Sequence, residues 1–171
     1  MLGGAALSGL RTRATAGAAP AAALLAAVSL GVGVLALVRA NLPPAVTPPP
    51  GLSEAQRTAC ATWHASLPAS LDGQQQRRTR PRSDLTAAYG SPAISLRCGV
   101  TVPGPDPDHG CLQDTSGTVD WLVVPRDRST LLLSYGRDPA VELVVPDAYA
   151  QAPVDALSSS IGTLPRNGLR C

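Results

Sequence analysis

The sequence predicts an α+β protein in which an N-terminal transmembrane helix is followed by a small, mostly antiparallel sheet flanked by two helices. Three observations support this prediction. Residues 14–38 form an uncharged run of 25 residues. Four segments between residues 93 and 145 have the apolar and β-branched pattern of strands. Segments with apolar side chains at helical spacing lie before and after these strands, and this order favours α+β.

The uncharged run and its borders predict a transmembrane helix over residues 14–39. About 20 apolar residues in a helix cross a bilayer core, so the run is long enough. Residues 1–13 carry two arginines and the terminal amine, against the single Arg39 on the other side. The positive-inside rule therefore places a short cytoplasmic N-terminus at the plasma membrane, with the rest of the chain outside. The alternative is a signal peptide cleaved after Ala40, but such signals have shorter apolar regions, so we expect an uncleaved signal anchor.

Residues 40–52 are predicted to be an extracytoplasmic linker. Five of the eleven residues 41–51 are prolines, which exclude a helix and favour an extended polyproline conformation. We expect this linker to be a stiff spacer. The remaining residues, 53–171, are enough for one domain with a buried core.

Two helices are predicted at the ends of this domain. The first begins at Ser53, which forms a capping-box pattern with Gln56, and it stops before Pro68. The second begins at Pro153, a residue that suits the first position of a helix. The apolar stripe of the first helix consists of Ala55, Ala59, Trp63 and Leu67, and that of the second consists of Val154, Leu157, Ile161 and Leu164.

Residues 74–82 form a basic segment with four arginines and no acidic residue. A loop of this kind could contact anionic lipid headgroups or anionic wall polymers. The alternative is a solvated surface loop, which is the more common role of a run of charges. The candidate interaction residues are Arg77, Arg78, Arg80 and Arg82.

Strands are predicted over residues 93–100, 119–124, 130–135 and 140–145. In the first, alternate residues place Ile94, Leu96, Cys98 and Val100 on one face. Turn-forming residues 136–139 connect the last two strands as a hairpin, and Glu142 is expected to point away from the core.

Four cysteines follow the predicted membrane segment and none precedes it, which indicates disulfides in an oxidising compartment. Cys60 borders the apolar stripe of the first helix, and Cys98 lies on the apolar face of the first strand. A helix packed on that strand would bring these two sulfur atoms together, so Cys60–Cys98 is the preferred pair. Cys111–Cys171 follows by elimination, although four cysteines allow three pairings.

Several motifs resemble one family. Cys60 in a helix that ends at Leu67-Pro68 is followed by the motifs Ala-Tyr-Gly-Ser-Pro at 88–92 and Leu-Arg-Cys-Gly-Val at 96–100. The motifs Val-Asp-Trp-Leu at 119–122 and Val-Glu-Leu-Val-Val-Pro at 141–146 extend the match. Together they resemble the actinobacterial membrane proteins known as domain of unknown function 3515.

The resemblance covers about residues 60–164 and implies a single-pass, sometimes lipid-anchored, extracytoplasmic protein. It implies no known activity and no catalytic residue, and it supports Cys60 and Cys98 as a pair. The chain departs from the expected pattern in having Tyr89 where a tryptophan is expected, and in its terminal Cys171.

Composition and motifs argue against several classes of function. Beyond residue 40 the chain has 11 arginines and 12 acidic residues, a balance that does not suit a nucleic-acid partner. The sequence lacks the Gly-x-Ser-x-Gly motif of many hydrolases. One loop contains Asp106, Asp108, His109 and Cys111, but their spacing matches no zinc-site pattern. We therefore expect no catalytic residue, no metal and no cofactor.

The expected role is that of a non-enzymatic accessory or interaction module of the cell envelope. Its partners would be the membrane and an envelope protein, or an anionic wall or lipid component. The alternative is an extracytoplasmic domain that binds a small ligand, and an envelope hydrolase is the third hypothesis. A hydrolase would need His64 or His109 beside a nucleophile and a carboxylate.

Overall fold

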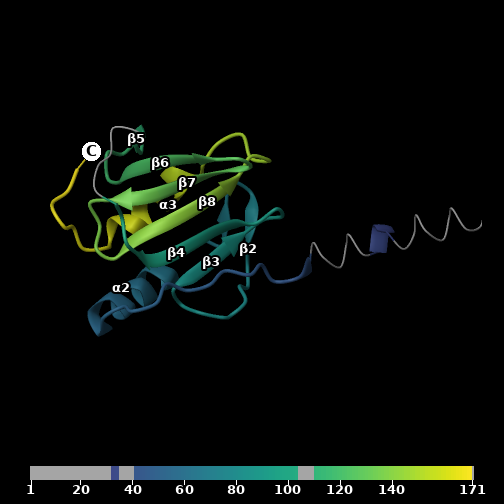
Figure 1. Cartoon of the computed structure of the whole chain (residues 1–171), viewed down its shortest axis with the longest axis horizontal. Helices are drawn as coiled ribbons and strands as arrows, with labels where there is room; N and C mark the ends of the chain where they lie inside the picture. Colours follow the sequence, from purple (N-terminus) through teal and green to yellow (C-terminus); the bar gives the residue numbers. More distant parts are fainter. Residues whose placement is uncertain (1–31, 35–40, 104–109, 171) are drawn as a thin grey trace, which may run out of the picture. The chain divides into compact units, whose positions relative to one another are not determined.

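The computed structural model describes residues 32–34, 41–103 and 110–170 (Figure 1). The compact unit is Leu42–Cys171. The predicted cytoplasmic segment 1–13 and most of the predicted membrane segment 14–39 lie outside the described residues; within that segment, Val32–Val34 are helical. In the described part of the chain, no helix is both long enough and apolar enough to span a membrane.

The unit is built on one eight-stranded sheet, and every pair of neighbouring strands in it is antiparallel (Figure 1). The sheet and its helices confirm the predicted α+β class with a mostly antiparallel sheet. The strands are β1 Ser70–Leu71, β2 Gln74–Arg77, β3 Thr86–Tyr89, β4 Ile94–Val100, β5 Gly110–Gln113, β6 Asp120–Arg126, β7 Ser129–Tyr135 and β8 Ala140–Pro146.

The strand order β1-β2-β3-β4-β8-β7-β6-β5 divides the sheet into two halves. Strands β1 to β4 follow one another in space as in sequence, and so do β5 to β8. The halves join where Cys98 of β4 pairs with Val141 of β8. Between β4 and β5 the chain therefore crosses to the opposite edge of the sheet and returns strand by strand to the centre.

Helices α2 (Glu54–Ala65) and α3 (Val154–Gly162) flank the run of strands in sequence, as predicted. The predicted capping box of α2 is present: the Gln56 amide donates to the Ser53 hydroxyl at 3.2 Å, and the Ser53 amide donates to the Gln56 side chain at 3.0 Å. The predicted start of α3 is displaced by one residue, because Pro153 is its N-cap and the first helical residue is Val154.

Both helices contribute to the same apolar core, so they cover one face of the sheet. Trp63 of α2 and Leu157 of α3 are fully buried in this core. Ala55, predicted as part of the α2 stripe, is exposed, because the helix contacts the sheet through its later turns. The strand residues of the core include Ile94, Leu96, Cys98, Trp121, Leu132, Val141 and Leu143.

The opposite face of the sheet has a smaller apolar cluster formed by Leu122, Leu131, Leu133 and Tyr135. Beside it, Arg97 of β4 and Glu142 of β8 form an ion pair at 3.0 Å. Glu142 therefore points away from the main core, as predicted, and it has a cross-strand partner of opposite charge.

A bulge in β4 corrects one predicted orientation. Cys98 pairs with Val141 but Val100 pairs with Ala140, so β4 has one residue more than β8 at this point. Gly99 adopts a φ of +96°, and a side chain there would collide with Leu52. Val100 consequently packs against the cluster on the opposite face instead of facing the core with Cys98.

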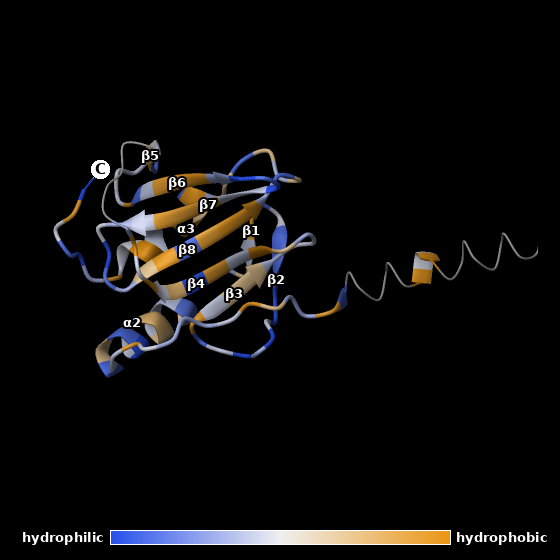
Figure 2. Cartoon of the chain, viewed as in Figure 1, coloured by the Kyte–Doolittle hydropathy of each residue, from blue (hydrophilic) through white to orange (hydrophobic). Residues whose placement is uncertain are grey.

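Four strands were not predicted. Strands β1 and β2 join through Asp72 and Gly73, which both have positive φ, as a tight hairpin requires. Strand β2 is hydrophilic (Figure 2), β3 is buried at all four positions and β5 is exposed at all four, so none of them shows apolar alternation. Sequence periodicity therefore predicted loops where pairing with neighbouring strands makes short β-strands.

The predicted linker packs against the domain along part of its length. Val46 and Pro49 are buried, and so is Leu52. Ala45 forms a parallel bridge with Arg80. The segment from Leu42 onward thus belongs to the compact unit, because its apolar side chains bury surface that a free spacer would expose.

The disulfide between Cys60 and Cys98 is present, which confirms the preferred pair. It joins α2 to the central strand β4, with both cysteines fully buried. Cys111 is also disulfide-bonded. Its predicted partner, Cys171, lies outside the described residues.

Asp114 is a buried carboxylate that organises the turn before β6. It accepts hydrogen bonds from the amides of Thr118 at 2.8 Å and Val119 at 3.0 Å, and from the Ser116 hydroxyl at 2.9 Å. Burial raises the pKa of Asp114, but hydrogen bonding by Ser158, Thr118, Ser116 and Val119 outweighs burial and leaves the pKa below its ordinary value.

The first prediction concerns the bond between α2 and β4. Replacing both Cys60 and Cys98 by alanine should lower the free energy of unfolding by about 2–4 kcal/mol, because the bond closes a long loop in the unfolded chain. Denaturant titration of the full chain measures this loss. The exposed substitution Ala61→Ser in the same helix is the control, and an unchanged midpoint in the double variant would contradict the prediction.

The second prediction concerns acid stability. A lowered pKa means that Asp114 stabilises the fold above the unfolded pKa of about 4 and that this contribution is lost as pH falls through the folded pKa. Asp114→Asn should therefore cost about 1–3 kcal/mol near neutral pH, and its difference from the wild type should shrink below about pH 4. Asp127→Asn, at an exposed turn, should show no such difference; a constant gap for Asp114→Asn across pH would refute the argument.

Candidate functional site

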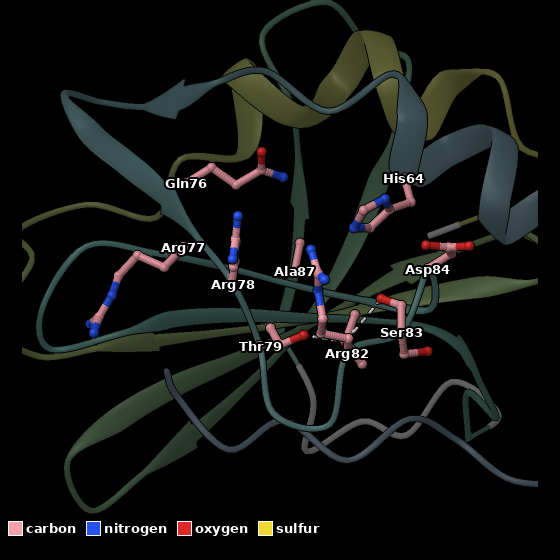
Figure 3. A pocket seen from close by; sticks show the side chains of 10 residues that line it. His64, Gln76, Arg77, Arg78, Thr79, Arg82, Ser83, Asp84 and Ala87 are labelled. Atoms are coloured by element: carbon pink, nitrogen blue, oxygen red, sulfur yellow. Dashed lines mark hydrogen bonds between the residues drawn. The ribbon is translucent and has the colours of Figure 1, made fainter. Parts of the chain in front are cut away.

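The basic segment predicted from the sequence surrounds a pocket beside the C-terminal end of α2. Arg77 is the last residue of β2, and Arg78, Arg80 and Arg82 lie on the connection from β2 to β3. The pocket has a volume of about 250 Å³. Its lining residues are His64, Gln76, Arg77, Arg78, Thr79, Arg82, Ser83, Asp84, Thr86 and Ala87 (Figure 3).

Two of the arginines are available for a ligand. Figure 3 shows the side chains of Arg78 and Arg82 extending into the space between Gln76 and His64. Both residues are exposed. In residues 41–103 and 110–170, neither guanidinium has a hydrogen bond or an ion pair with the protein. Their donors are therefore free to bind an external acceptor.

The other two arginines have different roles. Arg77 donates hydrogen bonds to the Gly90 carbonyl at 2.9 Å and to the Leu42 carbonyl at 2.7 Å. It therefore links the end of β2 to the turn after β3 and to the start of the compact unit. Arg80 does not line the pocket; its amide donates to the Pro44 carbonyl and its carbonyl accepts from the Val46 amide. The predicted set of four thus separates into Arg78 and Arg82, whose guanidinium groups have no partner among the described residues, and Arg77 and Arg80, which bond neighbouring backbone.

Buried hydroxyl groups stabilise the connection from β2 to β3, which lines the pocket. The Thr79 and Thr86 side chains share a hydrogen bond at 2.9 Å, and both residues are buried. Thr86 also donates to the Ser83 carbonyl at 3.3 Å, while the Leu85 amide donates to the Ser83 hydroxyl at 3.1 Å. These contacts fix the connection between β2 and β3, so the arginines project from an ordered backbone.

The disulfide positions the helical wall of the pocket. Cys60 and His64 are one helical turn apart and therefore lie on neighbouring positions of the same face of α2. The bond from Cys60 to β4 thus fixes His64 over the pocket. Beyond the helix, the Tyr89 hydroxyl donates to the Pro68 carbonyl at 2.8 Å, and burial raises the pKa of Tyr89 to about 12, so it stays a protonated donor.

The charge balance of the pocket is positive. Arg77, Arg78 and Arg82 face one carboxylate, Asp84, so the formal charge of the lining is three minus one, or +2, with His64 neutral. Arginine presents paired N–H donors that match the oxygens of a phosphate or carboxylate. The chemistry that suits this pocket is binding of an oxyanion.

The structure also brings together three residue types used in hydrolysis. His64, Ser83 and Asp84 line the same pocket, although 19 positions separate the histidine from the serine in sequence. Within the described residues no hydrogen bond joins any two of these side chains, and Ser83 accepts from the Leu85 amide. A working triad requires a hydrogen-bonded nucleophile, base and acid, so this arrangement lacks the connection that activates a serine.

Two other hollows of the unit also contain arginines: Arg137 lines both, and Arg166 and Arg170 line the smaller one, of about 90 Å³. A hollow of about 370 Å³ lies beside α2 and the bulge in β4, but its Gln56 and Asp138 side chains bond each other at 2.9 Å. Arg137, in the same hollow, is buried and donates to the carbonyls of Gly162, Leu164 and Thr118. Its guanidinium holds the end of α3 and is not available to a ligand.

The metal cluster considered from the sequence falls largely on Asp106, Asp108 and His109, which lie outside the described residues. Among the residues that are described, no group of three or more histidine, cysteine or acidic side chains is placed to hold a metal ion.

Sequence reasoning found the arginines but not the rest of the site. Nothing in the sequence connects His64 with Ser83 and Asp84, because the pocket forms only when α2 packs beside β2 and β3. The buried pair Thr79 and Thr86 likewise has no sequence signal beyond its hydroxyls.

Comparison with known proteins supports one assignment. The family model described as "Protein of unknown function (DUF3515)" matches residues 18–168. No curated protein and no solved structure matches the chain.

The third prediction separates the frame of the pocket from its ligand-facing side chains. Arg77→Gln should lower the free energy of unfolding by about 1–2 kcal/mol, because two carbonyl oxygens lose their charged donor. Arg78→Gln should change it by less than about 0.5 kcal/mol, since this exposed side chain has no partner in the part of the chain that the structure describes. Thermal denaturation of both variants measures the two losses of stability. Equal losses would contradict the distinction between Arg77 and Arg78.

Proposed function

Because the chain belongs to the DUF3515 family of proteins of unknown function, which offers no activity to transfer, we propose a function from the site itself. The protein is a membrane-anchored, extracytoplasmic module that binds an anionic component of the cell envelope without catalysing a reaction. The observation that carries this proposal is the pair Arg78 and Arg82, two guanidinium groups at one pocket that have no partner among the described residues.

The proposed location is supported by two independent features of the chain. The uncharged run near the N-terminus is long enough for an anchor, and the arginines around it favour an outward-facing domain. The disulfide between Cys60 and Cys98 suits an oxidising compartment such as the outside of a bacterial membrane. The family resemblance makes an actinobacterial envelope the proposed setting.

Binding is preferred to catalysis because of what surrounds the arginines. Exposed arginine pairs attract anions by charge and hydrogen bonding, and they need no activated nucleophile. An envelope hydrolase is the second candidate, favoured by the common position of His64, Ser83 and Asp84. The missing hydrogen bonds between these three side chains argue for binding.

The fourth prediction tests the pocket with tripolyphosphate as a model polyanion. The double variant Arg78→Gln/Arg82→Gln of the full chain should bind it at least about tenfold more weakly than the wild type, a loss of about 1.4 kcal/mol. Binding by the wild type should also weaken as salt is added, because the charges are exposed to solvent. Fluorescence titration with the protein in neutral lipid nanodiscs measures both effects.

A matched control is the double variant Arg126→Gln/Arg128→Gln, which removes the same charge from exposed positions at the turn between β6 and β7. It should retain wild-type affinity. Equal loss in both double variants would mean that net charge and not the pocket attracts the anion. Release of phosphate or another product from the bound probe, abolished by Ser83→Ala, would replace the binding hypothesis with the hydrolase.

A further inference from the structure

The basic segment is bonded directly to the first residues that follow the predicted anchor. Arg77 donates to the Leu42 carbonyl at 2.7 Å. Arg80 donates from its amide to the Pro44 carbonyl at 2.9 Å and accepts from the Val46 amide at 3.0 Å. Hydrogen bonds therefore hold residues 42–46, at the start of the compact unit, against the segment that carries the arginines of the pocket.

This connection limits how far the arginines can lie from a membrane. Only residues 39–41 separate the end of the uncharged run, Val38, from Leu42. An extended chain spans at most about 3.5 Å per residue, so Leu42 is held within roughly 14 Å of the end of the anchor. Within this upper limit, Leu42 can come inside the Debye length of about 8–10 Å, where exposed charges respond to a charged surface.

The side chains around this point suit a lipid–water interface. Arg78, Arg80 and Arg82 are all exposed, and Leu42, whose carbonyl bonds Arg77, exposes 52% of its surface. An apolar side chain beside several cations is the combination by which surface segments bind anionic bilayers. Asp84 is the single acidic residue that lines the pocket and it reduces the positive charge without reversing it.

We propose that the anion bound by Arg78 and Arg82 is the phosphate headgroup of an anionic lipid in the membrane that anchors the chain. The domain then docks on its own bilayer through the segment 77–82, with Leu42 at the interface. This inference rests on the proposed anchor and binding function, and it names the ligand class that the pocket takes. A phosphate-bearing wall polymer presents the same oxyanion, so the experiment must separate the two sources.

The test uses the full chain in nanodiscs of phosphatidylcholine, with or without phosphatidylglycerol. Amide hydrogen exchange over residues 77–86 reports docking, because a bound headgroup covers this backbone. We expect exchange to slow severalfold in the discs that contain phosphatidylglycerol, and the protection to disappear at about 0.5 M salt. The protection should be lost in Arg78→Gln/Arg82→Gln and kept in Arg126→Gln/Arg128→Gln.

The outcomes distinguish this inference from the proposed function. Equal exchange in both kinds of disc, with tripolyphosphate still bound through Arg78 and Arg82, would overturn lipid docking and leave the anion-binding function standing. Protection by an added phosphate-bearing wall polymer in phosphatidylcholine discs, without protection by phosphatidylglycerol, would assign the pocket to the wall. Absence of protection by any of these anions, together with no tripolyphosphate binding, would overturn both.

Discussion

The bond between Cys60 and Cys98 fixes α2 on the central strand of the sheet, and both the core and the candidate site depend on that placement. Trp63 becomes part of the buried core only because α2 lies against the sheet. One helical turn beyond Cys60, His64 lines the same pocket as residues of β2, β3 and the connection between these strands. A single covalent constraint therefore connects the packing of the domain with the geometry of its basic pocket.

The pocket also illustrates how neighbouring arginines acquire different roles. Arg77 and Arg80 hold the backbone that follows the predicted anchor, the first through its side chain and the second through its peptide groups. Arg78 and Arg82 have no protein acceptor within the described residues and remain available to an external anion. The run of four arginines between residues 77 and 82 therefore contains two that bond neighbouring backbone and two whose guanidinium groups have no partner among the described residues.

Buried charge serves a different purpose elsewhere in the unit. Asp114 and Arg137 are both buried and both bond the backbone: the carboxylate accepts from amides of the turn before β6, and the guanidinium donates to carbonyls at and just beyond the end of α3. Such groups stabilise a particular chain path because leaving either one unpaired would carry a large desolvation cost. These bonds explain why neither is a candidate for ligand binding, in contrast to the exposed arginines.

Local patterns in the sequence determined the class of fold, the capped start of α2 and the long strands β4, β6, β7 and β8, and they made Cys60–Cys98 the preferred pair among three. Each depends on side chains close together in sequence, such as Ser53 with Gln56, or on strong apolar periodicity. Only the tertiary structure decided the rest: the strands β1, β2, β3 and β5, the reversed orientation of Val100, the docking of residues 42–52 and the presence of His64, Arg78 and Arg82 in one pocket. These features arise from pairing with distant strands and from a one-residue bulge, and such long-range contacts leave no periodic trace in the chain that makes them.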